Sequence, residues 1–256
     1  MGGALASAVA KVASGKNMLL CDACAEKAGA LAAATGAEVV SLAILADKAD
    51  YIFLGVKPQG FEGLFETLRP MLKARENPPV LVSMAAGVSI GAVEKLADCG
   101  CPVIRMMPNT PVSVGEGMIL YAANASTEDA QLAVFCQALS KAGILDAIPE
   151  DKIDAASALS GCGPAFVYLF AEALADGAVS CGLPRDKAML YAAQTLRGAA
   201  ELLITSGKHP GELKDAVCSP GGTTIEGVKA LENGAFRASA MGAVTAAYEK
   251  TLKLKK

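Results

Sequence analysis

Short apolar runs separated by helix-like stretches dominate the first 150 residues of the chain. The runs are continuous rather than alternating, which is typical of strands covered by helices on both faces, as in a parallel α/β sheet. This pattern predicts strands at Asn17–Cys21, Tyr51–Val56, Val80–Met84, Val103–Met107, Gly117–Ala122 and Gly143–Ile148. It predicts helices at Ala23–Ala34, Phe61–Leu72, Ile90–Ala97 and Thr127–Lys141, the last with Thr127 as its N-cap.

The strand pattern stops at Pro149, and the remaining residues read as helices separated by Gly-Pro, Leu-Pro and His-Pro-Gly breaks. The helices are predicted at Ile153–Ser160, Pro164–Cys181, Pro184–Ser206 and Phe236–Leu254. An α/β block followed by an all-α block predicts two domains, residues 1–149 and residues 150–256.

Composition narrows the class of protein. Hydrophobic residues make up 53% of the 256 residues and charged residues 19%, so a sizeable core is expected and disorder is not. The net charge of −3 gives no electrostatic reason to expect nucleic acid or an anionic membrane as a partner. The most apolar segment, Ala155–Leu183, is interrupted by Glu172 and Asp176, which argues against a membrane-spanning helix. The N-terminus lacks the pattern of a signal peptide. We therefore expect a cytoplasmic protein.

The eight cysteines form only two tight clusters, Cys21–Cys24 and Cys99–Cys101. Neither has a second pair at the spacing of a zinc site, and the chain has one histidine. We therefore expect no metal site and cysteines that are reduced and mostly buried.

The N-terminus carries part of a dinucleotide-binding pattern. Such a unit runs strand, G-x-G-x-x-G, helix, and then an acidic residue about 20 positions later. Asp22 ends the first predicted strand at that distance from Gly2, which fits if Gly2 is the third glycine. The preceding strand would then be missing, which puts cofactor binding in doubt and predicts a start roughly 10–15 residues upstream. Two alternatives stay open: Gly2-Gly3 is a flexible end, and Asp22 caps the next helix.

A second candidate site lies at Ser219-Pro220-Gly221-Gly222, a tight turn that leads into a helix starting around Thr223. The two glycines allow close backbone approach to a ligand, and the first N–H groups of the helix can bind an anion. Thr223 and Thr224 add hydroxyl groups. The alternative is a plain turn with Thr223 as N-cap.

The segment from Pro210 to Glu232, which contains this turn, resembles the signature of pyrroline-5-carboxylate reductases. Three further segments agree with that family in order and spacing: Val56–Gln59, Met106–Pro111 and Leu159–Ala165. The likeness implies an N-terminal Rossmann-type domain without its first strand, then an all-α dimerisation domain through which subunits form a homodimer or larger homo-oligomer. Cys162 stands where the family commonly has serine.

The resemblance also implies the reaction, reduction of 1-pyrroline-5-carboxylate to L-proline with NADPH, NADH being tolerated. Together with the glycine pattern it gives cofactor contacts at Gly2, Asp22, Val56, Lys57, Pro58, Ala85, Ala86 and Asn109. It gives substrate contacts at Ser160, Ser219, Gly221, Gly222 and Thr223, with the Thr224 hydroxyl as the catalytic group near the ring nitrogen. Asp22 would accept ribose hydroxyls and repel a 2′-phosphate, and Lys27 is the nearest cation.

Two other functions stay open. A β-hydroxyacid dehydrogenase or ketopantoate-type reductase would need a catalytic lysine in the helical domain, and Lys187 and Lys208 do not lie in such a motif. A non-catalytic oligomerising protein that has lost cofactor binding is the other alternative. His209, the single imidazole, begins a His-Pro-Gly turn, where a structural or capping role competes with a role as an acid. A protonated cyclic imine is already electrophilic, so a dedicated acid is not required.

Overall fold

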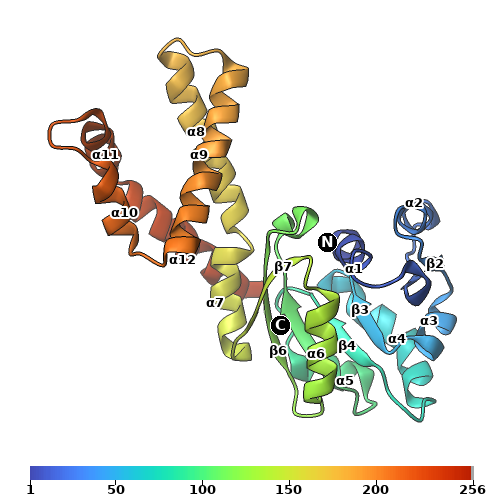
Figure 1. Cartoon of the computed structure of the whole chain (residues 1–256). Coiled ribbons are helices and arrows are strands. Elements are labelled where there is room, and N and C mark those ends of the chain that lie inside the picture. The colour runs from blue at the N-terminus through green and yellow to red at the C-terminus, as the bar shows by residue number, and fades with distance from the viewer. Residues whose placement is uncertain (255–256) are drawn as a thin grey trace. The chain divides into compact units, whose positions relative to one another are not determined.

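The computed structural model describes residues Met1–Leu254, which form two compact units (Figure 1). The first comprises residues 1–162 with the end of the chain from Ala247, and the second comprises residues 163–246. The sequence puts the boundary after residue 149, whereas helix α7 (Glu150–Ser160) packs with the sheet of the first unit. Residues 255–256 of the predicted second domain lie outside the described residues.

The first unit contains a five-stranded sheet in the order β3-β4-β5-β6-β7. Its strands are β3 (Tyr51–Leu54), β4 (Val80–Ser83), β5 (Val103–Met107), β6 (Gly117–Ala123) and β7 (Gly143–Ala147). The sheet is mostly parallel, as the apolar runs suggest, but β6 runs antiparallel to β5. Only the short helix η3 (Thr110–Val114) joins these two strands, and a connection without a long crossover suits antiparallel neighbours.

A separate two-stranded sheet precedes this one. It pairs β1 (Leu19–Leu20) with β2 (Glu38–Val39) in parallel, around helix α2 (Ala25–Thr35). Within residues 1–254, β1 has no ladder partner except β2, and β3 has none except β4. The sequence predicts a longer first strand and misses β2.

Helices cover both faces of the large sheet (Figure 1). One face packs on α3 (Leu42–Lys48), α4 (Phe61–Lys73) and α5 (Ile90–Ala97), and the other on α1 (Gly2–Val9) and α6 (Asp129–Ala138). Side chains of β4 alternate between the two layers: Leu81 joins the first core, and Val80 and Val82 join the second. This burial on both faces confirms the interpretation of the continuous apolar runs.

The N-cap of α6 is Glu128 rather than the predicted Thr127. Glu128 and Gln131 form a reciprocal capping box, which satisfies two backbone N–H groups at the start of the helix. The Thr127 hydroxyl donates instead to Asn124 Oδ1 at 2.8 Å. Because the capping box spans positions 128 and 131, it fixes the helix start one residue later than a threonine cap would.

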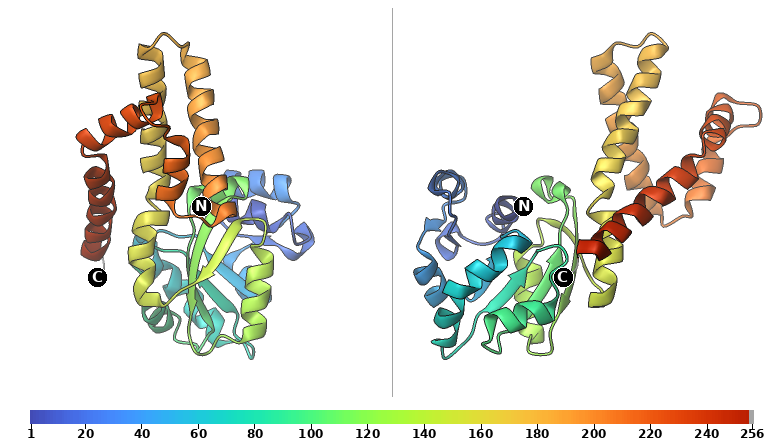
Figure 2. Two further views of the ribbon diagram at one scale, coloured as in Figure 1. Left: turned by 60° about the vertical axis from the view of Figure 1, so that its left-hand side comes forward. Right: turned by 180° about the vertical axis from the view of Figure 1, so that it is seen from behind.

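The second unit is helical. It contains α8 (Gly163–Ser180), α9 (Arg185–Ser206), α10 (Pro210–Val217), α11 (Thr223–Asn233) and the first part of α12 (Phe236–Leu254). Helices α8 and α9 run side by side as a hairpin (Figure 2). Within Glu150–Ser180 an 18-residue segment has a mean hydropathy of 1.4, so this stretch is long and apolar enough, by length and composition alone, to cross a membrane.

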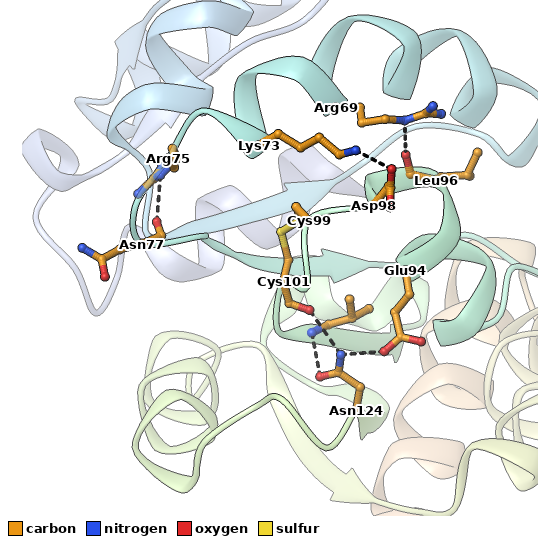
Figure 3. The surroundings of a disulfide bond; sticks show 11 residues. Arg69, Lys73, Arg75, Asn77, Glu94, Leu96, Asp98, Cys99, Cys101 and Asn124 are labelled. Carbon is orange, nitrogen blue, oxygen red and sulfur yellow. Dashed lines mark hydrogen bonds and ion pairs between the residues drawn. A yellow bond between two sulfur atoms is a disulfide. The ribbon is translucent and has the colours of Figure 1, made fainter.

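Cys99 and Cys101 form a disulfide, so the prediction of reduced thiols is wrong for this pair (Figure 3). Gly100 between them has a φ of +66°, which brings the two Cα atoms within 5.3 Å. The disulfide precedes β5, at the opposite end of the strand from Met107. The free cysteines are exposed or half-buried, so the prediction of mostly buried thiols is also wrong. The residues described include no group of three His, Cys, Asp or Glu side chains placed to hold a metal.

Candidate functional site

Three of the predicted site segments follow neighbouring parallel strands at their carboxyl ends. Residues 55–58 follow β3, residues 84–87 follow β4, and Pro108 and Asn109 follow β5. Because β3, β4 and β5 are parallel, these segments lie along one edge of the sheet, where ligands bind in open α/β folds. The structure therefore brings together the candidate cofactor residues of these three segments.

Helix α1 begins at this same edge. A Cβ atom added to Gly2 would lie 3.9 Å from Gly55 Cα, and one added to Gly55 would lie 3.7 Å from Gly2 Cα. The first turn of α1 has no side-chain cap, so its N–H groups are available to donate to an anion. Val56 is 37% exposed beside it, and Lys57 and Pro58 are also exposed.

In the loop after β4, the groups available to a ligand are main-chain atoms and one small side chain. Ala85 belongs to the hydrophobic core and is 3% exposed, whereas Ala86 is exposed. Gly87 adopts a φ of +75°, a conformation that favours glycine, and Ser89 caps α5 by accepting from the Ala92 N–H at 3.2 Å. A ligand at this loop would meet the Ala86 methyl group and main-chain atoms.

Asn109 uses both ends of its amide within the protein. Its Nδ2 donates to the carbonyl oxygen of Ser160 at 2.9 Å, and its Oδ1 accepts from the Met118 N–H at 2.9 Å. Ser160 is the last residue of α7, and its hydroxyl is shielded from solvent without a hydrogen-bond partner among the described residues. A predicted cofactor residue and a predicted substrate residue are thus directly bonded.

Asp22 is exposed, two residues beyond β1. Its Oδ1 accepts from the Cys24 N–H at 2.8 Å, and Cys24 is the N-cap of α2. The carboxylate therefore shapes the turn before the helix without capping α2 itself. Lys27 is exposed on the first turn of α2.

The Ser219–Gly222 turn lies in the helical unit. Gly221 has a φ of +69°, and the Gly222 N–H donates to the Ser219 carbonyl at 3.0 Å. Helix α11 begins at Thr223 as predicted, but its N-cap is Gly222, so the alternative of Thr223 as N-cap is wrong. Thr223 and Thr224 are exposed in the first turn, beside N–H groups that no side chain caps.

His209 is a capping residue. Its Nδ1 accepts from the Gly211 N–H at 3.1 Å at the start of α10, which confirms the structural alternative. The tyrosines near the sheet are poor acids: burial raises the pKa of Tyr51, and the hydrogen bond with Cys136 raises the pKa of Tyr121 to about 12.

Sequence reasoning misses a buried ionic cluster around Arg105 in β5. Its Nη2 lies 2.6 Å from Asp154 Oδ1 and its Nη1 lies 3.3 Å from Glu150 Oε1. The Arg105 and Asp154 side chains are only 4% and 2% exposed, and Glu150 Oε1 also accepts from the Ile90 N–H at 2.7 Å. The sequence does carry a signal for this cluster, because the charged Arg105 interrupts an otherwise apolar strand.

The sequence matches two family models, one described as pyrroline-5-carboxylate reductase dimerisation over residues 150–254 and one as NADP oxidoreductase, coenzyme F420-dependent, over residues 1–87. Pyrroline-5-carboxylate reductase 3 of Danio rerio is 46% identical over 79% of this chain and 69% of its own length. The Glycine max reductase is 42% identical over 81% of this chain and 74% of its own length.

The fold agrees with this relationship. The crystal structure of Plasmodium falciparum pyrroline carboxylate reductase with NADP bound superposes with a TM-score of 0.88. The two chains are 32% identical, and the superposition covers 100% of this chain and 95% of the Plasmodium falciparum chain. The chain therefore belongs to the pyrroline-5-carboxylate reductase family.

Proposed function

We propose that this chain reduces 1-pyrroline-5-carboxylate to L-proline by hydride transfer from NADPH, the last step of proline biosynthesis. The observation that carries the proposal is the alignment of residues 55–58, 84–87 and 109 along one sheet edge, next to the start of α1. Relatives at 42–46% identity carry the name of this reductase, and the Plasmodium falciparum neighbour holds NADP.

The residues at the sheet edge fit a dinucleotide. The Gly2–Gly55 approach leaves main-chain atoms at the surface without intervening side chains, which suits close contact with a flat cofactor. Val56, Lys57 and Pro58 would line the nicotinamide side together with Ala85 and Ala86. Gly2 and the uncapped N–H groups of α1 would face a phosphate. Asn109 lies at the same edge, but both ends of its amide are bonded within the protein.

The first turn of α11 fits the substrate carboxylate. Its N–H groups lack a side-chain cap, and Gly221 and Gly222 permit a ligand to approach the backbone. We assign the carboxylate to the backbone of Gly221, Gly222 and Thr223, and we assign the Ser160 and Ser219 hydroxyls as further substrate contacts. The shielded Ser160 hydroxyl, which lacks a partner in the described chain, supports a contact with ligand.

The role of this protein in the reaction is orientation. NADPH supplies the hydride when bound, and the protonated imine accepts it at the C=N carbon. The Thr224 hydroxyl would hold the ring nitrogen, while the α11 backbone fixes the carboxylate and so the face of the ring that is presented. Positioning of this kind supplies several kcal/mol of barrier reduction.

NADPH is the proposed cofactor, with NADH tolerated. Asp22 is exposed and one of its oxygens is engaged by the Cys24 N–H, so its other oxygen is available to a ribose hydroxyl. Lys27 on the next turn offers a cation to a 2′-phosphate. Comparison of the kcat/KM values for the two cofactors in Asp22→Asn tests which contact dominates.

The helical unit is proposed to form a homodimer or a larger homo-oligomer. Leu169 and Leu190 are 68% and 59% exposed within one chain, and the family model over this region is named for dimerisation. A second copy is therefore the proposed cover for the apolar stretch 150–180, rather than a membrane. Location in the cytoplasm remains a prediction of the sequence.

The alternative of a β-hydroxyacid dehydrogenase or ketopantoate-type reductase loses support, because the relatives described above are pyrroline-5-carboxylate reductases. Lys208 is engaged in an exposed pair with Glu212 at 2.6 Å, and Lys187 lies in the first turn of α9. Neither arrangement favours a catalytic lysine.

The test is an assay of imine-dependent NADPH oxidation with proline quantified as product. The assay is run on the chain from Met1 to Lys256. One proline formed per NADPH consumed supports the proposal. No proline formation by protein that binds NADPH would contradict it and favour the non-catalytic alternative.

A further inference from the structure

Helix α7 is held at both ends by side chains that belong to β5 and its carboxyl end. At the start of the helix, Arg105 pairs with Glu150 and with the buried Asp154. At the end of the helix, Asn109 donates to the carbonyl oxygen of Ser160. Only three residues lie between Arg105 and Asn109, and this short stretch contacts both ends of the eleven-residue helix α7.

The same cluster reaches the loop that follows β4. Glu150 Oε1 accepts from the Ile90 N–H at 2.7 Å, and Ile90 is the first residue of α5. The loop with Ala85 and Ala86 ends there, so Glu150 fixes the loop to Arg105 and thereby to β5. One strand therefore connects the loop assigned to the nicotinamide with Ser160, a residue assigned to the substrate.

The chemistry of these contacts fits a role in fixing the positions of α7 and the loop better than a role in stabilising the fold. Replacing a buried ion pair by apolar side chains is often neutral or stabilising, so a pair of this kind is weak evidence for a stabilising role. A guanidinium held by two carboxylates has a fixed orientation, and an amide that donates to one segment and accepts from another sets their separation.

We propose that Arg105, Asn109 and Glu150 are positioning residues, which set the distance between the nicotinamide loop and Ser160 without touching the reacting atoms. This inference rests on the proposed reductase function. It assigns Asn109 to the alignment of Ser160, in place of direct recognition of the cofactor. A displacement of about 1 Å between reacting groups lowers rates by up to a hundredfold, so small shifts of α7 would be visible in the hydride step.

The decisive variant is Asn109→Asp. The carboxylate keeps an oxygen that accepts from the Met118 N–H, but it loses the donor to the Ser160 carbonyl and places two oxygens together. The matched control is Asn124→Asp, at the other end of β5. Asn124 also bridges two backbone groups, accepting from the Val103 N–H at 3.0 Å and donating to the Cys101 carbonyl at 3.2 Å, close to the disulfide and away from the candidate site (Figure 3).

A second pair of variants tests the ionic contact between Arg105 and Glu150 at the start of α7. Glu150→Gln retains an oxygen for the Ile90 N–H but removes the charge that faces Arg105. Asp151→Asn removes a charge from the adjacent, exposed residue of α7, which pairs only with Lys152 among the ion pairs described. Both changes delete one carboxylate from the same helical turn.

The readouts are single-turnover hydride transfer, its deuterium isotope effect, NADPH affinity by fluorescence titration, and melting temperature. We expect Asn109→Asp to slow hydride transfer by at least tenfold with a larger isotope effect and unchanged NADPH affinity. Asn124→Asp should lower the melting temperature at least as much without slowing the transfer. Glu150→Gln should slow the transfer severalfold, and Asp151→Asn should not.

Three outcomes would overturn the inference. Equal slowing in Asn109→Asp and Asn124→Asp would mean that only general stability matters. Weaker NADPH binding with an unchanged transfer rate would make Asn109 a cofactor ligand. Unchanged transfer in both Asn109→Asp and Glu150→Gln would remove the positioning role. An unaltered protein that binds NADPH but transfers no hydride to the imine would instead refute the proposed function.

Discussion

The two units of this chain use apolar residues in opposite ways. In the sheet unit, Phe65, Leu68 and Phe135 are fully buried between strands and helices. In the helical unit, α8 and α9 share a buried cluster of three alanines, while Leu169 and Leu190 are largely exposed. Burial of an alanine contributes far less than burial of a leucine. The sheet unit therefore completes its core within one chain, whereas the helical unit needs a second surface.

This difference matters for where the chemistry lies. The rigid sheet edge presents the proposed nicotinamide contacts, and the helical unit presents the turn before α11. Loops on rigid scaffolds are common places for binding residues, because the scaffold fixes them while the loop varies. The cluster around Arg105 belongs entirely to the sheet unit and extends its rigidity into α7.

The largest effect is expected for Arg105→Met in the sheet unit. The change removes the guanidinium from the buried Asp154 carboxylate, and breaking a buried pair in this way costs about 3–5 kcal/mol. Urea unfolding measures the loss. The control is Arg185→Met, which removes an exposed pair with Asp176 and should have a much smaller effect. Equal losses in the two variants would show that burial of the pair is unimportant.

The next effect concerns assembly. Leu190→Glu puts a charge on the apolar face of α9, and loss of a buried leucine contact of about 1.5–3 kcal/mol weakens association roughly 10- to 100-fold. Light scattering over a dilution series measures it. Leu68→Ala is the contrast: it should lower stability by about 2–5 kcal/mol and leave the assembled mass unchanged. A Leu190→Glu protein with unaltered mass would contradict the account of the helical unit.

A smaller effect is expected for Thr224→Ala. Loss of one hydrogen bond to the ring nitrogen, worth about 1 kcal/mol, lowers kcat roughly five- to tenfold with the fold intact. Steady-state kinetics and circular dichroism check both parts. Thr205→Ala removes an exposed hydroxyl that donates only to the Glu201 carbonyl of its own helix, and serves as the control. Full activity of Thr224→Ala would refute the catalytic assignment.

The smallest effect is a pH dependence at Asp98. The hydrogen bond and charge of Lys73 hold the Asp98 pKa below its ordinary value of 3.8 (Figure 3). A lowered carboxyl pKa contributes stability above the ordinary pKa, and this contribution is lost as the pH falls through the lowered value. The melting temperature of Asp98→Asn should therefore lie slightly below that of the unaltered protein at neutral pH. The two should converge as the pH falls below the lowered pKa of Asp98. A difference that grows in acid would contradict this.

Strong local patterns made much of the sheet unit predictable. Ile90–Ala97 and Val103–Met107 have the predicted bounds, because a serine cap precedes the helix and an uninterrupted apolar run forms the strand. The helix that starts at Thr223 was also predictable from its two preceding glycines. The structure shows which groups surround the predicted site residues, but the roles of these residues stay predictions.

Other features were not accessible from local patterns. The antiparallel β5–β6 pair depends on the length of the connection. Strand β2 has only two residues, both exposed, so its apolar run is too short to predict a strand. The Cys99–Cys101 bond requires the left-handed conformation of Gly100, which composition does not specify. The partners of Arg105 lie 45 and 49 residues away in the chain, so the charge in the strand was visible but its partners were not.

The most direct test of the central claim follows the hydride itself. NADPH that carries deuterium at both hydrogen positions of nicotinamide C4 is supplied with pyrroline-5-carboxylate, and the proline formed is analysed by mass spectrometry. The account predicts proline that is one mass unit heavier, with the deuterium on C5, in proportion to the cofactor oxidised. Oxidation of the cofactor without labelled proline, or no oxidation by protein that binds NADPH, would contradict it.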